Sequence, residues 1–269
     1  MRPAHVTLSI IALFAFLAGA SSLAHGGPVP TPPIVTPPAQ ELRWGQEVVD
    51  DQRAHHHIVT NDPADAKRLA EVTDVLRPVA DAWYHGHFEF YLIDNDPYNA
   101  YAQYGPYVYV DKTLVAEAPN REELAAVLCH EMSHAIHHDA YLDAVKTDYD
   151  SFQKRLQRKI EMVLRGKGKK EVSAATGLFA NLLYDRHSRF EETLADLNGT
   201  DLCAESGINP WGMIWVFKRY EGGGLHVHIP TMFGDHPDFP KRISDVKKHF
   251  HDSPELFAHW SPDLKPTPF

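Results

Sequence analysis

A helix whose residues around a central motif are uncharged is predicted between Asn120 and His138, and the rest of the fold has to be arranged around it. Asn120 stands three residues before Glu123, the spacing of a capping box at the start of a helix. The residues that flank a central His-Glu-x-x-His motif are uncharged: Val127, Leu128, Met132, Ser133, Ala135 and Ile136. A helix with this composition is buried on most sides, so we expect other elements to pack around it.

His130 and His134 are four residues apart on this helix, so both imidazoles project from one face and can reach a single tetrahedral metal ion. Glu131 is offset from that face, and we expect it to take a proton from a water molecule that the metal activates. Zinc suits this arrangement best. A five-residue motif also arises by chance, so the alternative reading is a pair of histidines that face solvent or fill the core.

A catalytic zinc site needs a third protein ligand, and Glu192 is the predicted donor. It lies in another predicted helix, from Ser173 to Asn198. Asp196 follows one helical turn later and is predicted to accept the second N–H of a zinc-bound histidine. Acidic residues at this spacing usually face solvent, so the pair is meaningful only together with the two histidines.

Three motifs together resemble the CAAX prenyl endopeptidase family of zinc metallopeptidases, which includes HtpX-, BepA- and Oma-type proteins. They are His-Glu-x-x-His at 130–134, Ser-Arg-x-x-Glu-x-x-Ala-Asp at 188–196, and His236-Pro237 followed by Arg242. The resemblance spans roughly Trp44 to Phe250, and Asn99-Ala100-Tyr101 is similar to a hairpin of that family. Two departures are Ser133, where the family usually has Gly, and His138-Asp139, where an Arg-His pair often closes the helix.

The resemblance implies one zinc ion per chain and a role for each of the matching residues. The zinc ligands would be His130, His134 and Glu192. Glu131 would be the general base, and Asp196 would support one of the ligands. It also implies that His236 lies near the metal, where it either helps catalysis by stabilising the oxyanion or occupies the fourth position and blocks activity. The alternative for His236 is a turn residue before a helix.

The sequence predicts a mainly helical α+β domain over residues 41–260, of the zincin metallopeptidase type, with a small antiparallel β-sheet beside the active-site helix. Its strands are predicted at Phe88 to Ile93 and at Tyr107 to Val110. The residues Tyr107, Val108 and Tyr109 are expected to form the cleft edge to which an extended substrate peptide adds. Further helices are predicted at Ala64 to Trp83, Tyr141 to Leu164, Pro210 to Tyr220 and Pro240 to Phe250. Residues 261–269 are expected to be a flexible tail.

The first 24 residues are predicted to be a signal peptide, because Arg2 precedes an apolar run from Val6 to Leu17 that is short for a membrane span. An uncleaved anchor is the alternative. Residues 25–40 are rich in proline and are expected to be an extended linker. We therefore expect export to a bacterial periplasm, or else secretion. No integral membrane segment is expected in the mature chain, while a weak association with the membrane surface or with envelope proteins is left open.

The net charge limits the kinds of partner that we expect, and the positions of the two cysteines bear on a possible disulfide. The net charge is −10 and no basic block is present, so nucleic acid is not an expected partner. Cys129 adjoins one proposed ligand and Cys203 lies eleven residues beyond another. We expect their Cα atoms to be more than about 7 Å apart, which would leave two separate buried side chains and no disulfide.

These features together predict a zinc-dependent endopeptidase that hydrolyses peptide bonds of extended or misfolded exported proteins. One alternative is a catalytically inert, chaperone-like zinc-binding protein of the cell envelope. Digestion of an unfolded protein, with a chelator control, separates these two. The other alternative is a metal carrier that uses the 18 histidines, which would bind several ions weakly.

Overall fold

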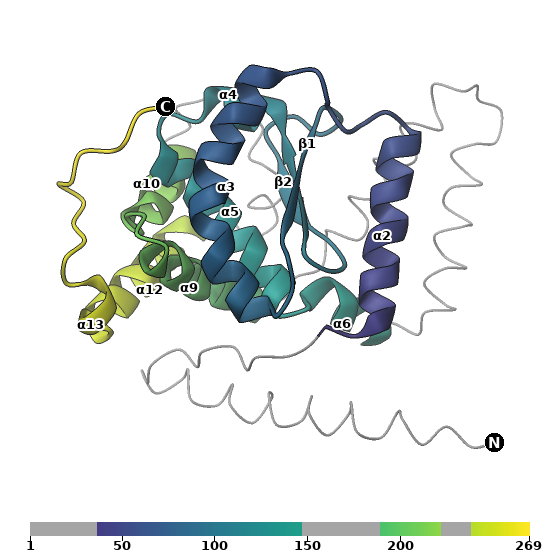
Figure 1. Ribbon diagram of the computed structural model, residues 1–269. Coiled ribbons are helices and arrows are strands. Elements are labelled where there is room, and N and C mark those ends of the chain that lie inside the picture. Colours follow the sequence, from purple (N-terminus) through teal and green to yellow (C-terminus); the bar gives the residue numbers. More distant parts are fainter. Residues whose placement is uncertain (1–36, 147–188, 222–237) are drawn as a thin grey trace, which may run out of the picture.

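The computed structural model describes residues 37–146, 189–221 and 238–269, which form helices packed around one small sheet (Figure 1). The helices are α2 (Ala39–Ala54), α3 (Pro63–Tyr84), α4 (Lys112–Glu117), α5 (Arg121–Ile136), α6 (Asp139–Lys146), α9 (Arg189–Glu205), α10 (Trp211–Glu221), α12 (Phe239–Asp252) and α13 (Pro254–Phe257). The strands are β1 (Glu89–Ile93), β2 (Ala100–Ala102) and β3 (Tyr107–Asp111). The mainly helical α+β class is confirmed. The signal peptide, nearly all of the linker, the 147–188 part of the predicted helices and His236 lie outside the described residues.

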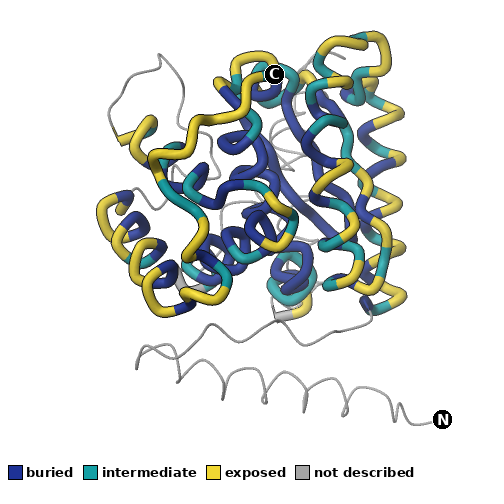
Figure 2. Tube along the Cα trace, turned by 60° about the vertical axis from the view of Figure 1, so that its left-hand side comes forward, coloured by how far each residue is buried: buried dark blue, intermediate teal, exposed yellow. Residues whose placement is uncertain are grey.

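Helix α5 is the centre of the fold, and all its residues from Glu122 to Ile136 are buried. Its start follows the prediction, because Asn120 Oδ1 accepts a hydrogen bond from Glu123 N at 2.9 Å and Asn120 Nδ2 donates to Glu123 Oε1 at 2.9 Å. Helices α3, α9 and α10 pack around it. The coloured tube shows this buried interior in dark blue with exposed residues on the outer helices (Figure 2). The run of uncharged residues from Leu124 to Cys129 therefore reflects the burial of α5.

The sheet is mixed, which corrects the prediction of an antiparallel sheet. Its strand order is β1-β3-β2: β1 runs parallel to β3, with Phe90 opposite Val108, and β2 runs antiparallel to β3, with Tyr101 opposite Tyr109. The chain first makes β1 and then adds the β2–β3 hairpin, which places β3 between the other two. The prediction that Tyr107 to Tyr109 form a substrate edge is therefore wrong, because the backbone of β3 already pairs on both sides.

The two faces of the sheet are covered by different helices. Val108 and Val110 belong to the main core with α3 and α5, whereas Tyr107 and Tyr109 form a second cluster with Val49 of α2. This division follows from the alternation of side chains along a strand. Figure 1 shows α2 on the opposite side of the sheet from α3. Helix α2 thus closes the aromatic face of the sheet.

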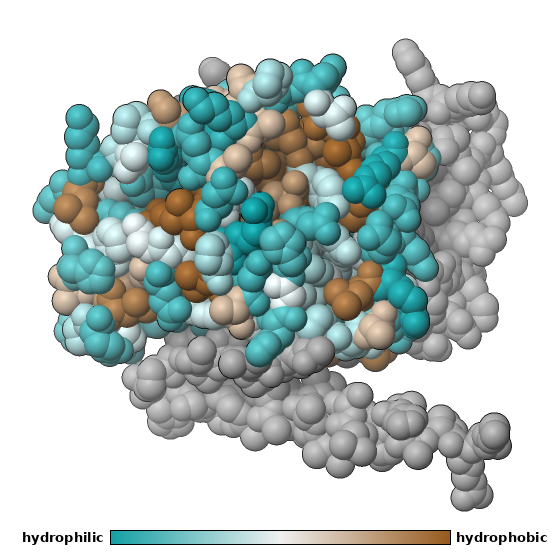
Figure 3. All heavy atoms as spheres, in the orientation of Figure 1, coloured by the Kyte–Doolittle hydropathy of each residue, from teal (hydrophilic) through white to brown (hydrophobic). Residues whose placement is uncertain are grey.

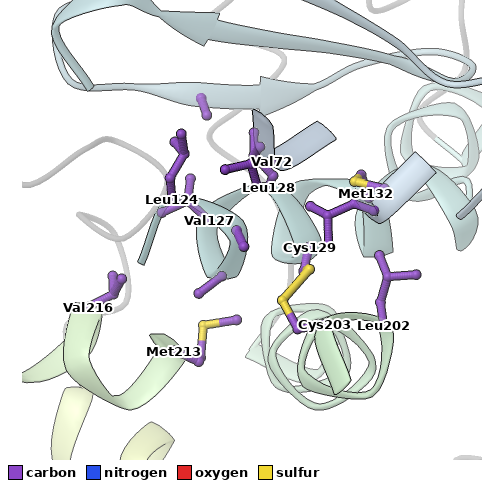
Figure 4. Packing of buried hydrophobic residues seen from close by; sticks show 14 of the residues in the cluster. Val72, Leu124, Val127, Leu128, Cys129, Met132, Leu202, Cys203, Met213 and Val216 are labelled. Carbon is purple, nitrogen blue, oxygen red and sulfur yellow. A yellow bond between two sulfur atoms is a disulfide. The ribbon is translucent and has the colours of Figure 1, made fainter. Parts of the chain in front are cut away.

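A disulfide joins Cys129 of α5 to Cys203 of α9, with their Cα atoms 6.1 Å apart, so the expectation of separate cysteines is wrong (Figure 4). The reason is the close approach of the two helices. A Cβ atom at Gly199, one turn before Cys203, would lie 3.1 Å from the backbone nitrogen of His130. The glycine lets α9 lie directly against the segment of α5 that carries the metal-ligand motif.

Residues 261–269 dock on the first turn of α5, in contrast to the flexible tail that was expected. Thr267 N donates to Glu122 Oε2 at 2.8 Å and Thr267 Oγ1 donates to Glu122 Oε1 at 2.7 Å. The backbone nitrogen of Arg121 donates to Thr267 O at 3.0 Å, and Arg68 lies over the ring of Phe269 at 4.7 Å. The buried carboxylate of Glu122 thus finds its donors in the tail.

The visible outer face of the described residues is mostly hydrophilic, with apolar residues in smaller areas between them (Figure 3). Large apolar side chains that are exposed lie singly on several elements: Leu42, Val75, Val145 and Leu264. Within the three described ranges, no helix combines the length and apolar character that crossing a membrane requires.

Candidate metal centre

Helices α5 and α9 bring His130, His134 and Glu192 to one point. The Nε2 atoms of the two histidines are 3.1 Å apart, Glu192 Oε2 lies 3.6 Å from His130 Nε2, and Glu192 Oε1 lies 3.5 Å from His134 Nε2. Ligand atoms about 2.0–2.1 Å from a tetrahedral ion are about 3.3 Å from one another. The spacing of the three donors therefore fits a single metal ion.

Each histidine is oriented by a buried aspartate on its other ring nitrogen. Asp196 Oδ1 lies 3.0 Å from His130 Nδ1, and Asp139 Oδ2 lies 2.8 Å from His134 Nδ1. A carboxylate at Nδ1 holds the proton there and leaves the Nε2 lone pair for the metal. Asp196 had been predicted next to a ligand, but Asp139 had not. The left-handed backbone of His138, with φ of 59°, turns the chain so that Asp139 faces back to His134.

Arg242 of α12 also takes part in this centre, although its motif gave it no role. Its Nε donates to Asp196 Oδ2 at 2.7 Å and its Nη2 donates to Asp196 Oδ1 at 2.6 Å. The same Nη2 is 3.5 Å from Glu192 Oε2, and the guanidinium lies 4.5 Å from the centre of the Phe217 ring. One planar side chain thus fixes Glu192 and Asp196 of α9 against α10 and α12.

Glu131 lies beside the donor group and is held by the sheet. The backbone N–H of Ala102 in β2 donates to Glu131 Oε2 at 2.9 Å. Burial raises the pKa of this carboxyl above its ordinary value, while His130 and His134 oppose the rise. A carboxylate that accepts a proton more readily than usual suits a general base. The strand next to Glu131 is therefore β2, and β3 lies behind it.

The sequence from 63 to 249 matches the model of one protein family, described as peptidase family M48. This range includes His130, His134, Glu192, Asp196 and Arg242. The chain belongs to peptidase family M48. A metalloendopeptidase is therefore the class of enzyme to which this chain belongs.

Curated relatives of this M48 chain carry the name Beta-barrel assembly-enhancing protease. The protein from Yersinia pestis is 47% identical over 185 residues, which are 66% of this chain and 33% of that protein. The protein from Escherichia coli O157:H7 is 43% identical over 235 residues, and that from Escherichia coli strain K12 is 24% identical over 230. Each of these two alignments covers 84% of this chain and 47% of the relative. The chain thus spans less than half the length of these relatives.

The charges of the M48 site favour ionised carboxylates at the metal position. Burial raises the pKa of Glu192, but the hydrogen bond to His134 and the charges of His130 and Arg242 outweigh it and bring that pKa below its ordinary value. Burial likewise raises the pKa of Asp196, and Arg242 outweighs it there, so that pKa is also lowered. Both acids therefore stay available as a ligand and as a hydrogen-bond acceptor.

His134 shows how protons and metal compete in the M48 site. Burial lowers its pKa, but the hydrogen bonds to Asp139 and Glu192 raise it further, and the net pKa is well above the ordinary value. An imidazole that binds metal through Nε2 has to be neutral there, so metal binding releases this proton. Metal affinity is therefore expected to fall as the solution becomes more acidic.

Proposed function

We propose that the chain is a zinc-dependent endopeptidase that cleaves extended or misfolded exported proteins. The observation that carries this proposal is the close spacing of two imidazole nitrogens and one carboxylate group, with Glu131 beside them. Nitrogen ligands together with a single carboxylate suit zinc better than the oxygen-preferring ions. The narrower grouping with the CAAX prenyl endopeptidases stays a prediction.

The residues divide the chemistry between them. A zinc ion held by His130, His134 and Glu192 would supply a Lewis acid that polarises the scissile carbonyl and lowers the pKa of water toward about 7. Glu131 takes the proton of the attacking water and delivers it to the leaving amine. The N–H of Ala102 orients the Glu131 carboxylate for this transfer. His236 is proposed to lie close by, as a helper or as an inhibitory fourth ligand.

The proposed setting is the envelope of a bacterium. The apolar run from Val6 to Leu17 supports export, with the periplasm as the proposed compartment and secretion as the alternative. The printed name of the relatives, Beta-barrel assembly-enhancing protease, supports substrates among the proteins of that envelope. Polypeptides are thus the proposed partners, and any contact with the membrane surface is proposed to be weak.

Replacing the general base tests this function directly. In a Glu131→Gln variant we expect one zinc ion per chain to remain bound, because Glu131 is not among the donors, while cleavage of an unfolded protein such as casein falls by at least about 1,000-fold. Metal analysis and product analysis by mass spectrometry measure the two effects. Glu123→Gln is the matched control, because Glu123 is a buried glutamate of the same helix that pairs with Arg219.

The same experiment separates the enzyme from an inert binding protein. Equal cleavage by the Glu131→Gln variant and the wild type would contradict the assignment of the base. A wild type that binds zinc and prevents aggregation of unfolded proteins, without releasing any products, would instead indicate the chaperone-like alternative.

A further inference from the structure

Helix α2 precedes the family-matched residues 63–249, yet one side chain of its otherwise exposed first turn is fully buried. Glu41, near the start of the helix, has 0% of its surface exposed. A buried carboxylate is costly unless polar groups compensate it, so its contacts indicate what it does. Figure 1 shows the N-terminal, purple end of α2 beside α6, next to the end of the metal-ligand helix.

The two oxygens of Glu41 contact two different segments of the chain. Oε1 accepts a hydrogen bond from the backbone N–H of Gly105 at 3.1 Å. Oε2 lies 2.7 Å from Nδ1 of His138. Both partners have a left-handed backbone, with φ of 77° at Gly105 and 59° at His138. One carboxylate therefore spans two tight turns, and the turn at His138 is unusual for a side chain other than glycine.

Each of these turns adjoins a residue that holds the candidate active site. Gly105 lies in the hairpin loop that follows Ala102, whose N–H orients Glu131. His138 directly precedes Asp139, whose carboxylate contacts Nδ1 of the ligand His134. Glu41 thus connects the loop after Ala102, which orients the general base, with the turn before Asp139, which orients a proposed metal ligand.

The next residues of α2 reinforce the same connection. The ring of Trp44 packs against Tyr104 at 5.2 Å and against Tyr141 at 5.5 Å, on the same two segments. A Cβ atom at Gly45 would lie 2.2 Å from the carbonyl oxygen of Tyr104, so only glycine permits this approach. The ring of Tyr84 covers His138 from the α3 side, at 5.5 Å. Helix α2 is therefore fixed to both turns along its first two turns.

We propose that Glu41 is a positioning residue of the metal centre, which keeps the His138 turn and the β2–β3 loop in register so that Asp139 orients His134 and Ala102 orients Glu131. This inference rests on the proposed metallopeptidase function. Under this proposal, α2, which lies outside the family match, helps to position the residues of the candidate active site.

The test compares three variants of the full chain. Glu41→Ala removes both contacts, and Glu41→Gln keeps an oxygen that can accept from Gly105 N. Val49→Ala is the matched control, because Val49 is buried on the same helix and packs in the cluster with Tyr107 and Tyr109 on the sheet. Zinc affinity is measured by competition with a chelator. The ring signals of His134 in the metal-free protein are followed by NMR, and the free energy of unfolding is measured in denaturant.

We expect Glu41→Ala to weaken zinc binding about tenfold and to shift the His134 ring signals, the size of effect typical of residues that hold a ligand in place. Glu41→Gln should show a smaller loss, and this variant decides the matter if Glu41→Ala does not fold. Val49→Ala should lower stability while zinc affinity and the His134 signals stay at wild-type values.

Two results would overturn the role of Glu41. The first is wild-type zinc affinity and unchanged His134 signals in both Glu41 variants. The second is an equal loss in Val49→Ala, which would assign the effect to the docking of α2 as a whole. A wild-type chain that binds no zinc would instead refute the proposed function, and the His134 signals of the metal-free variants would then still decide whether Glu41 positions that ring.

Discussion

Arg242 is the residue whose replacement should separate metal positioning from stability. Its guanidinium group donates hydrogen bonds to Asp196 through two nitrogens. A lysine offers one ammonium group, which cannot reproduce this geometry. We expect Arg242→Lys to weaken zinc binding by about 10- to 100-fold, because Asp196 then no longer holds His130 firmly. Isothermal titration calorimetry measures the affinity.

Arg219 provides the matched control for Arg242. It makes the same fork with Glu123, through Nε and Nη2 at 2.7 Å each, but at the opposite end of α5 from the metal ligands. Arg219→Lys should therefore lower the free energy of unfolding and leave zinc affinity unchanged. Equal losses of affinity in both lysine variants would show that Arg242 acts only on the stability of the fold.

At the level of residues, the sequence predicted the three candidate donors and Asp196, but neither Asp139 nor the contacts of Arg242. The i, i+4 spacing placed His130 and His134 on one helix face, and Glu192 lies beside them in the structure. Asp139 and Arg242 depend on a left-handed turn at His138 and on the docking of α12, and neither is a local property of the chain. Any signal for Asp139 was limited to its position directly after the helix.

The disulfide is the element-scale feature with the largest expected effect on stability. It connects α5 to α9 over a sequence separation of 74 residues. Removing it in a Cys129→Ser, Cys203→Ser double variant is expected to lower the free energy of unfolding by about 2–4 kcal/mol, because the unfolded chain gains freedom. Denaturant titration of both proteins under oxidising conditions gives the difference.

Reduction supplies the control for the disulfide. The reduced wild type and the double variant should unfold at similar denaturant concentrations, whereas the double variant should not respond to a reductant. A reductant that leaves the wild-type midpoint unchanged would contradict the contribution assigned to this bond.

At the level of elements, helices were predicted better than pairings. The capping residues at Asn120 and the periodicity from Ala64 to Trp83 are local signals, and α5 and α3 begin close to where they were expected. The direction of β1 relative to β3 and the docking of residues 261–269 depend on contacts far apart in sequence. The cysteine pair was misjudged for the same reason, since Gly199 sets the distance between α5 and α9.

For the whole molecule, a buried neutral histidine is expected to make stability fall in mild acid. Burial lowers the pKa of His137 from 6.5 to about 4, and its Nε2 lies 2.8 Å from Asn198 Nδ2. Between these two values the unfolded chain binds a proton that the folded chain does not, so stability decreases as the pH falls through this window. The total contribution is about 3 kcal/mol.

Unfolding in denaturant at several pH values between 6.5 and 4 measures this dependence, with His137→Gln as the comparison. The variant should lose less stability over the same range, because glutamine does not titrate. Parallel pH profiles for the variant and the wild type would assign the acid sensitivity to other groups.

Whether the disulfide between Cys129 and Cys203 forms depends on the compartment in which a copy of the protein resides. Thiols are oxidised outside the cytoplasm and kept reduced within it. A copy that stays in the compartment of synthesis has its two ligand-bearing helices associated by packing alone, whereas a translocated copy has them covalently locked one residue away from His130. Under the proposed export, the cross-link between α5 and α9 would therefore form only after the chain has left the cytoplasm.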